Sequence, residues 1–179
     1  MDRLGLALIY GSVRPGRFCD TVAAWVAEEI RSSGAFRLDL IDPAVDMSDR
    51  DFRRWIDAAD AFVVVTPEYN HSFPGPLKTA IDRAREEWHA KPVGFVSYGG
   101  ASGGLRAIEH LRGVFAELHA VGIRDSVSFP NAWERFDAQG RPLDEAGCSR
   151  ALARMLAQLG WWGRALRAAR AAEAFGEAA

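Results

Sequence analysis

The first polar segment of the chain groups a hydroxyl with two guanidinium groups in the run Gly11-Ser12-Val13-Arg14-Pro15-Gly16-Arg17. It separates a short apolar run from a stretch of helical period that begins near Phe18. A helix N-terminus has free N–H groups and a partial positive charge, so hydroxyl and guanidinium groups beside it favour the binding of an anion. The residues that we expect to bind a single terminal phosphate are Gly11, Ser12, Arg14 and Arg17.

This segment differs from two common phosphate-binding loops. Gly11 and Gly16 have the spacing of the P-loop of nucleotide triphosphatases. However, Arg17 and Phe18 stand where that loop needs Lys and then a magnesium-binding Ser or Thr. The G-x-G-x-x-G dinucleotide fingerprint is also absent, because Val13 occupies the position of its second glycine. Two arginines in a loop also occur in solvated turns, so the segment alone leaves that alternative open.

A second polar segment, rich in Pro and Gly, is Pro67-Glu68-Tyr69-Asn70-His71-Ser72-Phe73-Pro74-Gly75-Pro76. It follows an apolar run and precedes a helix predicted to start near Leu77, and its composition indicates a stiff wall with outward-facing amide groups. We expect Tyr69 and Phe73 to cover a flat ring and Asn70 to contact the polar rim of that ring. A single exposed aromatic at Tyr69 is the alternative. His71 is expected to be a solvent-facing loop residue.

Four glycines fall within the third segment, Gly99-Gly100-Ala101-Ser102-Gly103-Gly104, between a predicted strand and a long predicted helix. Glycines allow backbone amides to approach a ligand closely and to adopt positive φ angles. The segment also contains the G-x-S-x-G pattern of the α/β-hydrolase nucleophile elbow. That family places an acid and then a histidine after the serine, and no histidine follows Asp125, Asp137 or Asp144. Glu109 and Glu117 do precede a histidine, but each shares a predicted helix with it, on which adjacent residues point about 100° apart. A serine hydrolase is therefore disfavoured.

Apolar runs of strand length alternate with helical stretches along the chain, as in the repeated β-α units of a parallel sheet. The expected strands are Leu4 to Tyr10, Phe36 to Ile41, Ala61 to Thr66, Val93 to Tyr98 and a weaker Asp125 to Phe129. We predict one domain over residues 1–179, of the α/β class. It is a doubly wound five-stranded parallel sheet of order 2-1-3-4-5 with helices on both faces. Ligands of this fold bind beyond the carboxyl ends of the strands, where all three polar segments would lie.

The last predicted helix spans Asp144 to Trp162 and buries Leu152, Met155, Leu156 and Leu159. An Ala/Arg-rich tail over residues 164–179 is expected to be either a solvated helix or frayed. Trp161 and Trp162 are expected to cap the core or to lie in a subunit interface, because aromatic residues are enriched in both places.

Taken together and in this order, the three segments resemble the loops of the NADPH-dependent FMN reductase family. The resemblance covers residues 11–17, 67–82 and 98–107, and it implies a flavodoxin-like fold with FMN as the cofactor and NADPH or NADH as the electron donor. The implied cofactor-binding residues are Ser12, Arg14 and Arg17 around the phosphate, Pro67, Glu68, Tyr69 and Asn70 along the ring, and Gly99, Gly100, Ser102 and Gly103 on its pyrimidine side. Tyr98, which directly precedes this last group, is also expected to bind the cofactor. Many members continue the first loop with Ser-x-Asn, whereas this chain has Arg17-Phe18-Cys19. The family also implies a homodimer or homotetramer.

The resemblance implies an oxidoreductase that passes electrons through FMN to a small acceptor in a two-step exchange. The acceptor is a quinone, an azo compound, a free flavin or a metal oxyanion, and no catalytic side chain is expected because hydride transfer needs alignment rather than an acid or base. The alternative is a flavodoxin-type electron carrier with a protein partner. A flavin-free α/β interaction domain is the third interpretation.

The composition excludes several other classes. The net charge of -2 with interspersed signs predicts neither a nucleic-acid partner nor a membrane surface. The apolar run Leu4 to Tyr10 is too short to span a bilayer and is followed by no cleavage signal, so we expect a cytoplasmic protein. Cys19 and Cys148 lack the spacing of a redox pair or a zinc site, so both are expected to be reduced and no metal is expected.

Overall fold

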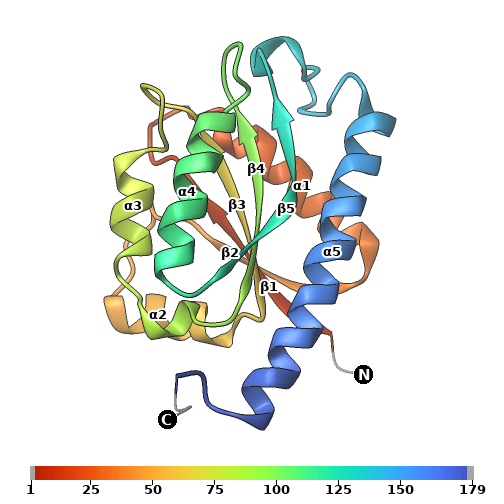
Figure 1. Ribbon diagram of the computed structural model, residues 1–179. Helices are drawn as coiled ribbons and strands as arrows, with labels where there is room; N and C mark the ends of the chain where they lie inside the picture. Colours follow the sequence, from red (N-terminus) through yellow and green to blue (C-terminus); the bar gives the residue numbers. More distant parts are fainter. Residues whose placement is uncertain (1–2, 177–179) are drawn as a thin grey trace.

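A five-stranded parallel sheet runs through the computed structural model, which describes residues 3–176 (Figure 1). Its order is β2-β1-β3-β4-β5, which confirms the predicted doubly wound α/β fold. The strands are β1 (Leu4–Tyr10), β2 (Phe36–Ile41), β3 (Ala61–Pro67), β4 (Pro92–Tyr98) and β5 (Val121–Phe129). The helices are α1 (Cys19–Ser33), α2 (Asp49–Ala58), α3 (Gly75–Ile81), α4 (Leu105–Glu117) and α5 (Glu145–Ala172), with short 3-10 turns η1 (Glu86–Trp88) and η2 (Ala132–Glu134).

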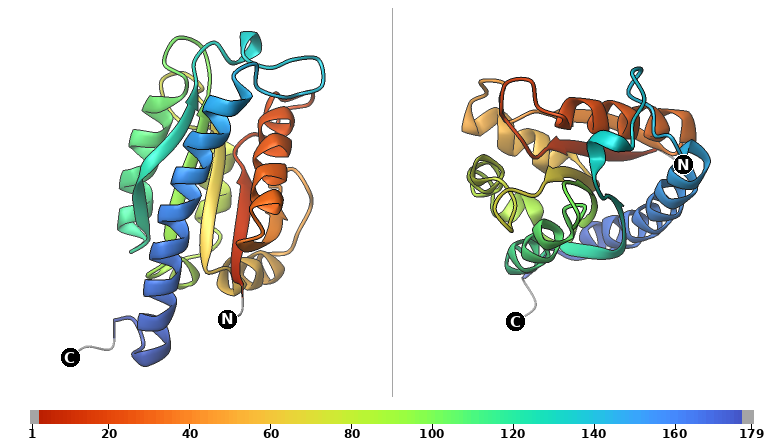
Figure 2. Two further views of the ribbon diagram at one scale, coloured as in Figure 1. Left: turned by 90° about the vertical axis from the view of Figure 1, so that its right-hand side faces the viewer. Right: turned by 90° about the horizontal axis from the view of Figure 1, so that it is seen from above.

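Helices cover both faces of the sheet, with α1 and α5 on one face and α2, α3 and α4 on the other (Figure 2). Side chains alternate along β1, so Leu6 and Leu8 join the core under α1 and α5 whereas Ala7 and Ile9 join the opposite core. All residues of β3 and β4 are buried, which explains their continuous apolar sequences. Burial on both faces fixes the register of the strands, and the register in turn fixes where the loops at their carboxyl ends lie.

Four predicted strands match the structure to within one residue at each end, but β5 begins at Val121 rather than Asp125. It is an edge strand in which Arg124 is exposed, and its pairing with β4 shifts register between Val93 and Phe95. A half-exposed, irregular strand carries no continuous apolar run, so its first half was not predicted. Helix α2 was not predicted either, because its apolar stripe is short and buries only Phe52 and Ile56.

Helix α5 extends to Ala172, well beyond the predicted end at Trp162. Its last turns are held by Asp60, whose carboxylate lies 3.3 Å from both the Arg167 and the Arg170 guanidinium groups. The same carboxylate accepts the Gly5 N–H at 3.0 Å. The tail is therefore a docked helix through residue 172, and residues 177–179 of the predicted tail lie outside the described residues.

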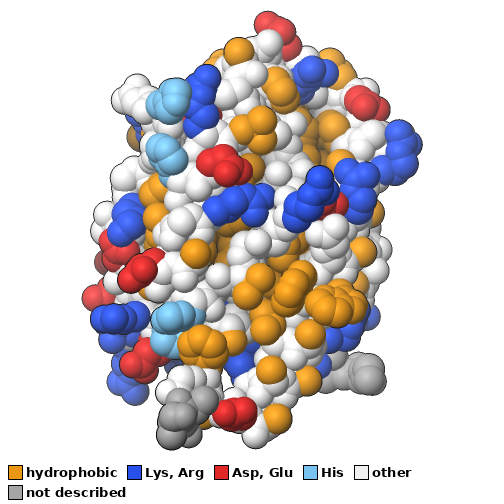
Figure 3. Space-filling model, in the orientation of Figure 1, with side chains coloured by type: hydrophobic (Ala, Val, Ile, Leu, Met, Phe, Trp, Pro, Cys, Tyr) orange, Lys and Arg blue, Asp and Glu red, His pale blue; other side chains and the backbone are white. Residues whose placement is uncertain are grey.

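Large apolar side chains are exposed on α5. Trp161 is 59% and Trp162 is 36% exposed, and their rings pack against each other at 5.1 Å. They do not cap the core, so a role in a subunit interface stays a prediction. Figure 3 shows hydrophobic side chains gathered on the lower half of one face, while acidic and basic groups are interspersed. Within residues 3–176, no helix combines the length and apolarity needed to cross a bilayer.

Replacing Asp60 with Ala should lower the free energy of unfolding by about 1–3 kcal/mol, because the Gly5 N–H and two guanidinium groups lose their shared acceptor. Urea denaturation measures this change. The matched control is Asp82→Ala, which removes an exposed i,i+4 pair with Lys78 and should cost less than about 0.5 kcal/mol. Equal losses in the two variants would contradict the role given to Asp60.

Candidate functional site

Three loops meet beyond the carboxyl ends of β1, β3 and β4, at the upper edge of the sheet in Figure 1. Main-chain hydrogen bonds continue the strand pairing into these loops. The Gly11 N–H donates to the Val65 carbonyl at 2.7 Å, and the Glu68 N–H donates to the Tyr98 carbonyl at 3.2 Å. The parallel register thus brings segments 11–17, 67–76 and 99–104 together, at the edge where doubly wound folds bind ligands.

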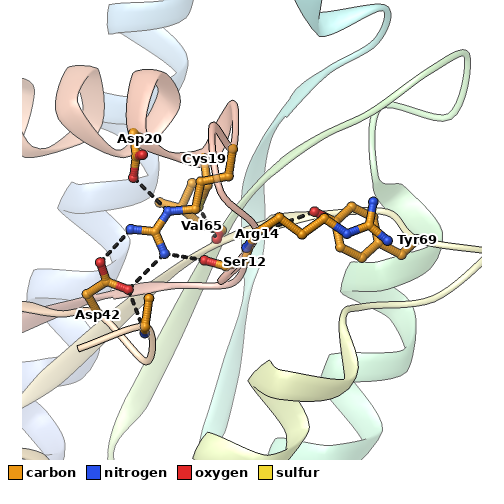
Figure 4. Close-up of polar contacts among 9 residues, drawn as sticks. Ser12, Arg14, Cys19, Asp20, Asp42, Val65 and Tyr69 are labelled. Carbon is orange, nitrogen blue, oxygen red and sulfur yellow. Dashed lines mark hydrogen bonds and ion pairs between the residues drawn. The ribbon is translucent and has the colours of Figure 1, made fainter. Parts of the chain in front are cut away.

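Gly11 lets the first loop leave β1 in close contact with β3. A Cβ atom here would lie 2.7 Å from the Val65 carbonyl oxygen, so only glycine fits. The buried hydroxyl of Ser12 shares a hydrogen bond of 2.8 Å with Tyr69 Oη. The Arg14 guanidinium lies 3.8 Å from the centroid of the Tyr69 ring (Figure 4). Ser12 and Arg14 therefore join the first loop to the second.

The Arg17 guanidinium binds neighbouring acceptors within the protein. It pairs with Asp42, which follows β2, and with Asp20 in the first turn of α1 (Figure 4). Its Nη1 lies 2.8 Å from Asp42 Oδ1 and also donates to the Ser12 carbonyl oxygen. This guanidinium holds the pKa of Asp42 below its ordinary value. Arg17 thus links the first loop to β2 and α1, and its predicted contact with a phosphate stays a prediction.

The N-terminus of α1 has no side-chain cap, and its first turn carries one acidic residue, Asp20. Phe18 is the N-cap residue and its side chain accepts no hydrogen bond, so the helix dipole and first-turn N–H groups lack a side-chain cap. A hollow of about 300 Å³ lies between the first and second loops. The residues that line it are Val13, Arg14, Tyr69, Asn70, Phe73, Pro74, Gly75 and Pro76.

The second loop turns back on itself at Asn70 and His71. Tyr69 and Ser72 exchange main-chain hydrogen bonds of 2.8 and 3.1 Å, while Asn70 and His71 have φ angles of 49° and 73°. Positive φ at both central positions is the geometry of a type I′ turn, which Asn tolerates better than most residues. The turn exposes Asn70 and His71 at its tip, as predicted for His71.

Glu68 joins the second loop to the third. Its side chain is only 8% exposed, and its carboxylate accepts the Ser102 hydroxyl at 2.7 Å and Arg106 Nη1 at 2.6 Å. Burial alone would raise the pKa of Glu68, but the hydrogen bonds from Ser102 and Arg106 outweigh it and lower the pKa. Ser102 therefore donates its proton to a carboxylate, and this contact gives it no histidine base of the kind that a serine nucleophile needs.

The glycines of the third loop hold a tight connection between β4 and α4. Gly103 and Gly104 have φ angles of 61° and 85°, and a Cβ atom on Gly104 would lie 2.7 Å from the Ser97 Cβ. The Gly103 carbonyl accepts hydroxyl hydrogen bonds from Ser97 at 2.7 Å and from Ser128 at 2.8 Å. These bonds fix the base of the loop and leave Gly100 exposed at its tip.

Tyr98 is the last residue of β4 and lies buried beneath these loops. Its side chain is 5% exposed and its ring lies 5.9 Å from that of Phe18. Burial raises the pKa of Tyr98, so it stays a neutral phenol at physiological pH. The predicted binding residues Gly99 and Gly100 follow it directly in the chain, so its packing helps to set where their amides lie.

The structure adds charged partners that the sequence analysis did not assign to the site. Two of them, Asp20 and Asp42, pair with Arg17. The third, Arg106, pairs with Glu68. The sequence could have indicated Asp42 as a site residue, because it directly follows a strand that ends at the same edge of the sheet. Within the described part of the chain, no group of three or more His, Cys, Asp or Glu side chains is arranged to hold a metal.

These features suit the parts of flavin mononucleotide. The uncapped α1 terminus and Arg14 suit a phosphate. The first and second loops line a hollow, and the third loop beside them exposes main-chain amides at Gly100. The class that this fold and site define is the flavodoxin-like flavoproteins.

The chain belongs to the NADPH-dependent FMN reductase family, whose model matches residues 5–134. Family membership makes it an oxidoreductase with FMN as cofactor and NAD(P)H as electron donor, which confirms these predictions.

Two relatives and one solved structure illustrate the similarity. An NAD(P)H-dependent FMN reductase of Schizosaccharomyces pombe is 35% identical over 147 residues, covering 70% of this chain and 73% of that protein. An NAD(P)H:quinone oxidoreductase of Solanum tuberosum is 42% identical over 114 residues, covering 59% of this chain and 58% of that protein. FerB, a flavoenzyme NAD(P)H:(acceptor) oxidoreductase from Paracoccus denitrificans, has a TM-score of 0.70 at 21% identity, covering 90% of this chain and 98% of that one. The structural likeness supports the fold.

Replacing Glu68 with Gln should lower the free energy of unfolding by about 1–2 kcal/mol at pH 7, because the bonds from Ser102 and Arg106 lose the charge of their acceptor. The folded-state pKa of Glu68 lies below 4.5, so the wild-type advantage is complete above pH 4.5 and disappears as the pH falls through the folded pKa. Denaturation at several pH values measures the difference. Glu109→Gln, at a 73% exposed side chain of α4, is the control and should change little.

Proposed function

We propose that the chain transfers electrons from NAD(P)H to a small acceptor of the quinone type. The observation that supports this proposal most is the meeting of three polar loops at one sheet edge, beside the uncapped α1 N-terminus, where the first two loops line a hollow of about 300 Å³. The Solanum tuberosum relative, whose name gives a quinone as its substrate, supports the choice of acceptor.

Two groups of residues would hold the cofactor at opposite ends. The phosphate end is assigned to Gly11, Ser12 and Arg14 with the N-terminus of α1. The ring end is assigned to Pro67, Glu68, Tyr69, Asn70, Gly99, Gly100, Ser102 and Gly103. Arg14 is the one exposed cation among them, and the bond between Ser12 and Tyr69 connects the two ends.

Bound FMN supplies the redox chemistry, because its ring accepts a hydride and passes electrons on. The residues of this chain bind and orient, and none is required as an acid, a base or a nucleophile. We propose that donor and acceptor bind in turn over the exposed side of the FMN ring, since the turn at Asn70 and His71 is exposed at the rim of the hollow.

We also propose a cytoplasmic homodimer or homotetramer. Exposed apolar side chains outside the hollow, namely Trp161, Trp133 and Leu105 at 59%, 68% and 50%, support an interface between copies of the chain. The interspersed charges and the net charge of -2 support small-molecule rather than nucleic-acid partners.

The purified protein should be yellow, or become so on adding FMN, and should lose its colour under anaerobic conditions when NADPH is added. Addition of 1,4-benzoquinone should restore the colour, which absorbance near the flavin band follows. A protein that cannot be loaded with FMN would contradict the proposal. A yellow protein that NADPH does not bleach would instead support the flavodoxin-type electron carrier.

Replacing Arg14 with Ala should weaken FMN binding by about 1.5–3 kcal/mol, the usual contribution of a hydrogen bond to a charged group. Calorimetric titration of the flavin-free protein measures the affinity. Arg54→Ala is the control, because Arg54 is a 76% exposed arginine on α2 that pairs only with Asp51 among the described contacts. Unchanged affinity in the Arg14 variant would remove this residue from the site.

A further inference from the structure

Arg17 uses most of its hydrogen-bonding capacity inside the protein. A guanidinium has five N–H donors. Nε donates to Asp20 at 2.7 Å, Nη1 donates to Asp42 at 2.8 Å and to the Ser12 carbonyl, and Nη2 donates to the second oxygen of Asp42. The side chain is only 9% exposed, and the Tyr10 ring centroid lies 5.0 Å from its central carbon.

From this geometry we infer that Arg17 is a positioning residue for the phosphate loop and that Asp42 fixes it in place. The inference rests on the FMN site proposed above. Arg17 then acts on the cofactor through the loop, whereas Arg14 supplies the exposed positive charge.

The contact with Ser12 explains how a positioning role can work. In a trans peptide the C=O and the following N–H point in opposite directions. Because Arg17 holds the Ser12 carbonyl, the N–H of Val13 points away from the guanidinium. The Ser12 hydroxyl is meanwhile bound to Tyr69 and accepts the Arg14 N–H at 3.4 Å. The main chain and the side chain of Ser12 are therefore both held by hydrogen bonds before an anion binds.

The charges around Arg17 also argue against a direct phosphate contact. Asp20 and Asp42 together carry two negative charges against one positive charge, so the cluster is net negative. A phosphate brought against it would meet like charge. Replacing Asp42 therefore distinguishes two possible roles of Arg17, a direct phosphate ligand and a positioning residue. A direct phosphate ligand would gain affinity when its competitor is lost, whereas a positioning residue would lose its anchor.

The test compares the affinities of the flavin-free protein for FMN and for riboflavin, which lacks the phosphate. Arg17→Gln and Asp42→Asn should each weaken FMN binding about 10-fold, and the double variant should be no weaker than either single variant, because the two residues act as one unit. Riboflavin affinity should change less than about twofold, since among residues 3–176 no hydrogen bond or ion pair joins this pair directly to the ring loops. Quenching of flavin fluorescence gives both affinities.

Asp20→Asn is the matched control. It removes the same charge from the same guanidinium, but Asp20 is 60% exposed whereas Asp42 is 23% exposed. FMN affinity should stay the same or rise slightly in this variant. Asp42→Asn keeps the size of the side chain, so it decides the question even if Arg17→Gln fails to fold.

The outcomes separate this inference from the proposed function. Loss of FMN affinity in Arg17→Gln together with a gain in Asp42→Asn would make Arg17 a direct ligand and overturn the inference alone. Equal losses for FMN and riboflavin, or no loss in either variant, would also overturn it alone. A wild-type protein that binds neither flavin would overturn the proposed function and this inference together.

Discussion

Two hydrogen-bonded links hold the loops at the carboxyl edge of the sheet in one arrangement. Ser12 binds Tyr69 across the first two loops, and Glu68 binds Ser102 and Arg106 across the second and third. Both links depend on the parallel register of β1, β3 and β4, which buried apolar side chains on both faces of the sheet fix. The packing of the apolar core therefore determines how far apart the polar groups of the three loops lie.

The links also divide the site into two ends with different electrostatics. At the phosphate end, a helix N-terminus and Arg14 provide positive potential, while the two carboxylates paired with Arg17 outweigh its positive charge. At the ring end, Glu68 is neutralised by Arg106, and glycines leave the main chain as the exposed surface. Tyr69 belongs to both ends, because its hydroxyl binds Ser12 while its ring lines the hollow. A cofactor with an anionic tail and a flat head matches this division.

The sequence predicted best where local and global constraints agree. Strands β3 and β4 are buried on both faces, so their apolar runs marked them directly, and glycine- and proline-rich composition marked the loops that follow them. The sequence predicted less of the structure where an element or a side chain is held by a residue far away in the chain. The last turns of α5 depend on Asp60, more than 100 residues earlier in the chain. Arg17 carried a clear charge signal, but its partner Asp42 comes from a different β-α unit, and only the folded chain shows that the two meet.

The most direct test of the central claim is a crystal structure of the protein grown with FMN. We expect the phosphate over residues 11–17 at the N-terminus of α1, with Arg14 in contact, and the ring between residues 67–70 and 99–103. The links from Ser12 to Tyr69 and from Glu68 to Ser102 should persist in the complex. A flavin bound elsewhere, or one whose phosphate lies away from the first loop, would contradict the assignment of this edge of the sheet.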